Sequence, residues 1–133
     1  MPGVTGAFLG GVASHFALDT VPHWGVTRPM RELLHVAVPD GLLGLTVMAT
    51  ATLAAPPHRR VRVLAAMAGA AFPDLDKPST LFFGASPFPR RWDDFHQRIQ
   101  HESPRRMPQE LLVGLGASLV VAVVSRQAAL RRG

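Results

Sequence analysis

The apolar run from Leu33 to Ala55 limits what this chain can fold into more than any other feature of its sequence. A helix needs about 20 mainly apolar residues to cross the hydrocarbon core of a bilayer. This run reaches that length, contains a single carboxylate, Asp40, and is followed by Pro56 and Pro57, which cannot continue a helix. The run therefore predicts a membrane-spanning helix.

Three further apolar runs accompany it, and none alternates apolar and polar residues as a half-buried strand does. They are rich in Ala, Leu and Gly, and small residues let helices approach one another closely in lipid. We predict an all-α fold, a small bundle of about four transmembrane helices with one longer polar loop, in a single domain over residues 1–133. The expected helices cover residues 3–23, 32–55, 60–76 and 109–128.

The composition favours a membrane protein. Charged residues make up 17% of the chain, against about 25% in typical soluble domains. The net charge of +5 comes almost wholly from Arg residues between the apolar runs, where membrane proteins place them. The sequence has no basic stripe interleaved with aromatic residues, so we expect no nucleic-acid partner. We expect a multi-pass protein of the inner (plasma) membrane whose partner is the lipid bilayer; a soluble bundle with the shorter apolar runs as its core is an alternative.

Ionisable side chains would gather at one membrane face if the four helices crossed the bilayer in turn. The end of the first helix, the start of the second, the end of the third and the long loop all reach that face. Only one of the six histidines, His58, would lie at the opposite face. The groups brought to the shared face are His15, Asp19, His23, His35, Asp40, Asp74, Asp76, His96 and His101.

The spacing within the first apolar segment adds to this pattern. His15, Asp19 and His23 are four residues apart, so a helix would align them along one stripe. Ionisable groups inside membrane segments are costly and usually face a partner or a water-filled cavity. Imidazole and carboxylate groups bind zinc and similar divalent ions, and the absence of Cys excludes thiolate ligands. Taken singly, each residue also has an ordinary explanation, such as ending a helix.

Three motifs resemble those of the bacterial inner-membrane-bound, metal-dependent hydrolases. Pro73-Asp74-Leu75-Asp76-Lys77-Pro78 resembles the family's P-D-x-D-x-P signature. His96 and His101 keep the histidine spacing of its H-R-x-x-T-H-S signature, although Gln100 replaces the Thr and Glu102 precedes Ser103. Gly10 to Asp19, with Ser14 and His15, is similar to its S-H-x-x-x-D helix, which here comes first in the chain instead of last.

The resemblance implies a divalent-metal site more directly than it implies a substrate. The expected metal is zinc, with manganese as the alternative. Its ligands would be His15, Asp19, Asp74 and His101. The residues that complete the site or act as a general base would be His23, Asp76 and His96, with Asp40 orienting a histidine from outside.

Three functions follow from these patterns. The first is a membrane-embedded metal-dependent hydrolase that acts on a lipid or another amphiphile. The second is a non-enzymatic membrane scaffold or a small transport component that uses the acids as an ion path. The third possibility is that the chain is not a membrane protein and forms the soluble helical bundle. Metal content separates the first two, and partition between water and detergent identifies the third.

Overall fold

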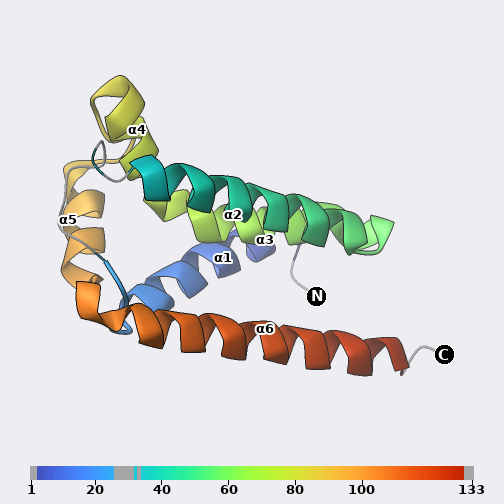
Figure 1. Ribbon diagram of the computed structural model, residues 1–133. Helices are drawn as coiled ribbons and strands as arrows, with labels where there is room; N and C mark the ends of the chain where they lie inside the picture. The colour runs from blue at the N-terminus through green and yellow to red at the C-terminus, as the bar shows by residue number, and fades with distance from the viewer. Residues whose placement is uncertain (1–2, 26–31, 33, 131–133) are drawn as a thin grey trace. The chain divides into compact units, whose positions relative to one another are not determined.

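The computed structural model describes residues 3–25, 32 and 34–130, and the regular elements within them are helices, with no strand (Figure 1). The prediction of an all-α fold is confirmed. The α-helices are α1 (Val4–Asp19), α2 (Leu34–Ala54), α3 (Arg60–Ala71), α4 (Asp76–Phe83), α5 (Arg90–Ile99) and α6 (Met107–Leu130). Short 3-10 turns are η2 (Pro57–Arg59), η3 (Phe72–Leu75) and η4 (Pro104–Arg106).

The chain forms two compact units. The first unit comprises residues 1–21 and 27–100 and contains α1 to α5. The second comprises residues 22–26 and 101–133 and contains α6. In the second unit His23 and Glu102 form a parallel bridge, in which His23 N–H donates to the His101 carbonyl at 3.2 Å and Ser103 N–H donates to the His23 carbonyl at 3.1 Å.

In the first unit, α1 and α3 touch backbone to backbone at two glycines. A Cβ atom added to Gly11 would lie 2.1 Å from the carbonyl oxygen of Ala66. A Cβ atom added to Gly69 would lie 2.1 Å from the carbonyl oxygen of Phe8. Both distances are far below van der Waals contact, so only glycine allows this crossing. Small residues allow similarly close approach between helices in membranes. The crossing fixes the end of α1 against the end of α3.

Two predicted helices end earlier than expected, in each case near a proline. The predicted helix over 3–23 is too long, because α1 ends at Asp19. Pro22 disfavours helical conformation in the residue before it. His23 therefore does not continue the stripe of His15 and Asp19. The predicted helix over 60–76 is divided into α3, η3 and α4, because Pro73 has no N–H for the helical ladder.

The expected long polar loop contains a helix, so that expectation is wrong over α5. Its apolar face is formed by Trp92, Phe95 and Ile99, spaced three and four residues apart. The rings of Trp92 and Phe95 each pack edge-to-face on Phe16 of α1, with centroids 5.2 Å apart. This packing attaches α5 to α1.

Two segments of the described chain are long and apolar enough to cross a membrane. They are Leu34–Ala54, with a mean hydropathy of 1.5, and Pro104–Val123, with a mean hydropathy of 1.3. Neither is buried inside the protein. With 16 residues in α1 and 12 in α3, these two helices are shorter than the usual span. The prediction of about four spanning helices is therefore not confirmed.

The glycine contact can be tested with two neighbouring substitutions on α1. We expect Gly11→Ala to destabilise the protein by about 1–3 kcal/mol, because its methyl group would overlap the α3 backbone. Gly10→Ala is the matched control, since a Cβ atom there meets nothing within 4 Å. Thermal unfolding followed by circular dichroism measures both variants. Equal midpoints for Gly10→Ala and Gly11→Ala would contradict the contact.

Candidate metal centre

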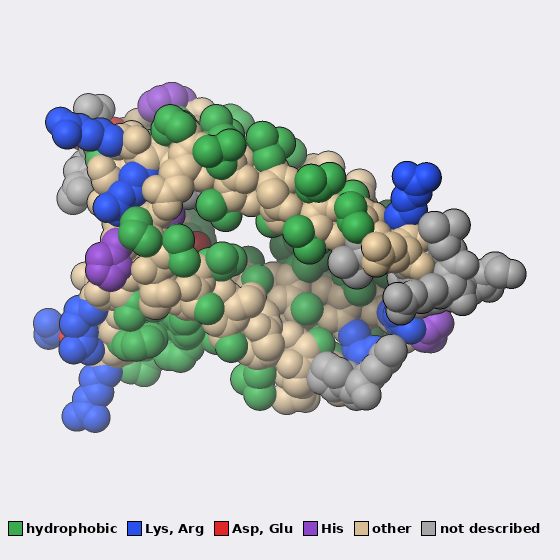
Figure 2. All heavy atoms as spheres, turned by 90° about the horizontal axis from the view of Figure 1, so that it is seen from below, with side chains coloured by type: hydrophobic (Ala, Val, Ile, Leu, Met, Phe, Trp, Pro, Cys, Tyr) green, Lys and Arg blue, Asp and Glu red, His purple; other side chains and the backbone are tan. Residues whose placement is uncertain are grey.

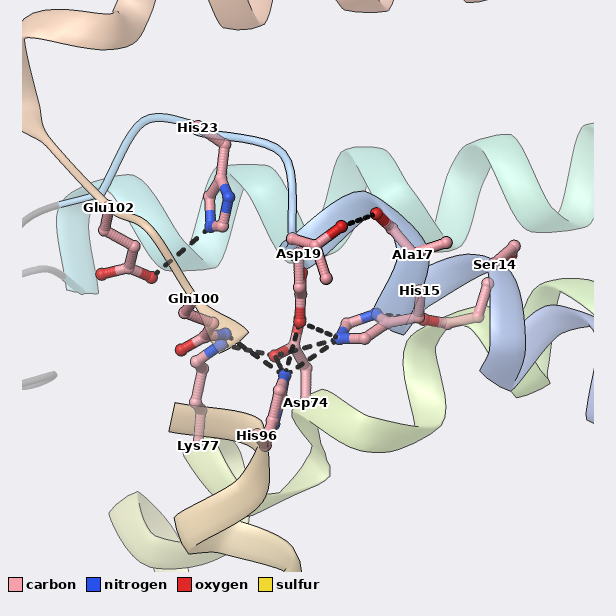
Figure 3. A network of polar contacts seen from close by, with 12 residues as sticks. Ser14, His15, Ala17, Asp19, His23, Asp74, Lys77, His96, Gln100 and Glu102 are labelled. Atoms are coloured by element: carbon pink, nitrogen blue, oxygen red, sulfur yellow. Dashed lines mark hydrogen bonds and ion pairs between the residues drawn. The ribbon is translucent and has the colours of Figure 1, made fainter. Parts of the chain in front are cut away.

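Three side chains from α1 and α5 converge at the end of α1 (Figure 3). Nε2 of His15 and Nε2 of His96 lie 3.1 Å apart. Oδ2 of Asp19 lies 3.1 Å from the first nitrogen and 2.8 Å from the second. Zinc bound to nitrogen and oxygen at about 2.0–2.1 Å in a tetrahedral site separates its ligand atoms by about 3.3 Å. These three atoms are therefore spaced almost as the ligands of one such ion.

Two carboxylates from the turn after α3 extend the same cluster. Oδ1 of Asp74 lies 3.9 Å from Nε2 of His15 and 3.9 Å from Nε2 of His96. Asp74, Asp76 and His96 each offer a ligand atom, and these atoms lie within 4.8 Å of one another. Lys77 Nζ donates a hydrogen bond to Oδ1 of Asp74. We refer to His15, Asp19, Asp74, Asp76 and His96 as the His/Asp cluster.

The local sequence explains how these side chains come together. His15 and Asp19 occupy the last turns of α1 at a spacing of four, which places them on one face. Asp74 and Asp76 follow the break that Pro73 imposes on α3. His96 lies on the apolar face of α5, where its ring also packs on Phe16, and only 2% of the residue is exposed.

The ring of His15 is oriented by a backbone carbonyl. Nδ1 of His15 lies 2.7 Å from the carbonyl oxygen of Ala70, near the end of α3. A carbonyl only accepts, so Nδ1 donates to it, and in the neutral imidazole Nε2 then has a lone pair that faces the cluster. Pro73, three residues after Ala70, has no N–H to occupy this carbonyl in the 3-10 turn. A carbonyl acceptor behind the ring is the usual arrangement for a metal-binding histidine.

The cluster is buried on one side and open on the other. The side chains of His96, His15 and Asp19 are 3%, 11% and 13% exposed. Those of Asp74 and Lys77 are 44% and 37% exposed. A molecule that enters the cluster from outside therefore meets Asp74 and Lys77 first.

The donor set fits a divalent cation. Oδ1 of Asp76 is buried, and no described residue donates a hydrogen bond to it. An acceptor withdrawn from water without a partner is costly, and a carboxylate more so. Three carboxylates close together repel one another, and Lys77 supplies one positive charge against them. A cation among these oxygens and the two imidazole nitrogens would offset both costs.

The other predicted site residues lie elsewhere in the chain. His23 and His101 belong to the second unit, where Nε2 of His23 faces Oε1 of Glu102 at 3.8 Å. Asp40 lies on α2, directly after Pro39. Among the described residues, neither group of potential metal ligands includes any of these three. Their roles as ligand, base or supporting group stay predictions from the sequence.

Two neighbours of the cluster were not expected from sequence. Lys77 binds Asp74, and Nε2 of Gln100 lies 3.2 Å from Nε2 of His96. Lys77 could have been noticed as the only lysine of the chain, placed inside the P-D-x-D-x-P motif. Gln100 could not, because its contact depends on where α5 ends.

Comparison of the chain with protein-family models, curated proteins and solved structures gives no match. The resemblance to the metal-dependent hydrolases therefore depends on the motif residues alone. Of those residues, the structure brings together His15 and Asp19 from the S-H-x-x-x-D helix with two residues of the P-D-x-D-x-P motif, Asp74 and Asp76. His96, from the motif with the two histidines, joins them.

The orientation of His15 is directly measurable. In ¹⁵N-histidine-labelled, metal-free protein at a pH where imidazoles are neutral, we expect the Nδ1–H form, because Ala70 accepts that proton. Long-range ¹H–¹⁵N correlation spectra distinguish the two tautomers. His58, which is exposed and accepts a hydrogen bond at Nε2 from Arg59, provides an internal reference. Protonation of His15 at Nε2 would contradict the arrangement.

Proposed function

We propose that this chain is a membrane-embedded, metal-dependent hydrolase whose His/Asp cluster binds a divalent cation, zinc or manganese. The observation that supports it best is the convergence of three side chains of the cluster. Nε2 of His15 and Nε2 of His96 lie 3.1 Å apart, and Oδ2 of Asp19 lies within 3.1 Å of both. The carbonyl behind His15 and the unpartnered oxygen of Asp76 add to this support.

The side chains divide into two roles. His15, Asp19, His96 and Asp74 would hold the cation, with His96 in place of the predicted ligand His101. The cation would supply Lewis acidity, polarising the bond to be hydrolysed. Asp76 would act as general base, because its Oδ1 has no hydrogen-bond donor among the described residues and can accept the proton of an attacking water.

The distribution of apolar side chains supports a membrane location. Among the described residues, no Val, Leu, Ile, Met or Phe side chain is buried, and many are more than half exposed. Figure 2 shows such side chains spread over the visible surface. A soluble domain of this length would bury a core of such residues. Lipid around α2 and α6 would cover the apolar surface that the protein leaves exposed, and the substrate class we propose is accordingly an amphiphile.

Metal content tests the proposed site. Protein purified in detergent should contain a stoichiometric divalent metal by elemental analysis. We expect His15→Ala and His96→Ala to lower metal affinity more than tenfold, since even supporting residues of metal sites have effects of about 10–100-fold. His58→Ala is the matched control, because its imidazole lies outside the described ligand groups.

Substitution of a carboxylate tests metal binding while both imidazole rings of the cluster stay in place. Asp74→Asn should lose metal, whereas Asp94→Asn, an exposed position on α5, should retain it. Circular dichroism shows whether each variant still folds. Wild-type protein that folds without binding any added divalent metal would refute the site and favour a scaffold or transport role.

The membrane location is tested by two substitutions at equally exposed positions. Leu45, in the middle of α2, and Val61, at the start of α3, are both 64% exposed. We expect Leu45→Arg to reduce the protein recovered in the membrane fraction, since Arg at the centre of a span costs about 2.5–3.5 kcal/mol. Val61→Arg, between Arg60 and Arg62, should have little effect. If both variants stay in the aqueous phase without detergent, the soluble bundle is correct.

A further inference from the structure

Lys77 is the cation at the open side of the His/Asp cluster. Its Nζ donates to Oδ1 of Asp74, the same oxygen that lies 3.9 Å from both imidazole nitrogens. Its side chain is 37% exposed, whereas that of His96 is 3% exposed. The Lys77 ammonium group has three N–H donors, and Asp74 takes one of them.

The charges of the cluster indicate which kind of ligand this exposed ammonium group would attract. Asp19, Asp74 and Asp76 contribute three negative charges, and Lys77 contributes one positive charge. A bound divalent cation would bring the sum to zero, so the metal-loaded site would no longer repel an anion. The exposed ammonium of Lys77 would then offer a positive charge beside Asp74. Lysine is a common phosphate-binding residue and acts as a compact point charge.

We propose that Lys77 binds an anionic phosphate group of the substrate and positions it beside the metal-loaded cluster. This inference rests on the proposed function, since it takes the cation to be present. It narrows the substrate class from any amphiphile to one with a phosphate group. Lys77 is a substrate-positioning residue in this account and holds no metal.

The single lysine gives a direct measurement on the intact chain. Expression with lysine labelled with ¹³C at Cε labels Lys77 alone, because the chain has no other lysine, and leaves its three N–H donors in place. In zinc-loaded, detergent-purified protein, we expect inorganic phosphate to shift the ¹³C signal of Lys77 and to saturate. Sodium chloride at the same ionic strength is the control and should not produce the same curve.

Variants separate charge from a merely structural role. Lys77→Met should retain zinc and weaken phosphate binding about tenfold or more, because a charge-assisted hydrogen bond is lost. Lys77→Arg should keep most of the phosphate affinity, since it keeps the charge. Arg98→Met, which removes an exposed cation beside Asp94 and Gln97, should leave phosphate affinity unchanged.

A second arm identifies the source of the phosphate. Dihexanoyl phosphatidate is titrated in place of inorganic phosphate, below its micellar concentration. Tighter binding of the lipid than of inorganic phosphate, reduced in Lys77→Met, supports a phospholipid head group. Equal binding of the two supports a free phosphate or a soluble phosphate ester.

Two results would overturn the inference, and they are distinguishable. If zinc binds but neither phosphate compound moves the Lys77 signal, the role of Lys77 is refuted while the metal site stands. If elemental analysis shows that neither zinc nor manganese binds, the proposed function fails, and this inference fails with it.

Discussion

The first and third helices meet where Gly11 and Gly69 each leave no space for a side chain, so that each backbone lies against carbonyl groups of the other helix. The His/Asp cluster depends on this contact. It brings the last turn of α1 to the end of α3, close enough for His15 to donate to the carbonyl of Ala70. A larger residue at either glycine would separate the helices and, with them, His15 from Asp74.

Much of the fold could be predicted from the sequence, because long apolar runs without alternation have few other solutions. The expected helix over 32–55 corresponds closely to α2, and that over 109–128 lies within α6. The errors arose where short-range signals compete. Proline ended two helices early, and α5 has too few residues for its amphipathic pattern to stand out within a polar stretch.

The membership of the cluster was predictable in part. A spacing of four places His15 and Asp19 on one helical face wherever the helix lies, and Asp74 and Asp76 follow a proline that ends a helix. The choice between His96 and His101 was not predictable, because it depends on α5 ending at Ile99. His96 is in the helix that packs on α1, whereas His101 lies beyond it in the second unit.

The contact between α1 and α3 also affects how this protein can diverge. Since the two helices are held by main-chain atoms, the side chains on their exposed faces have no part in setting the distance between them. Leu9 and Leu64, which are 59% and 46% exposed, can therefore be exchanged for other apolar residues with little effect on the cluster. The approach of the two backbones therefore depends on two small residues and not on the larger apolar side chains around them.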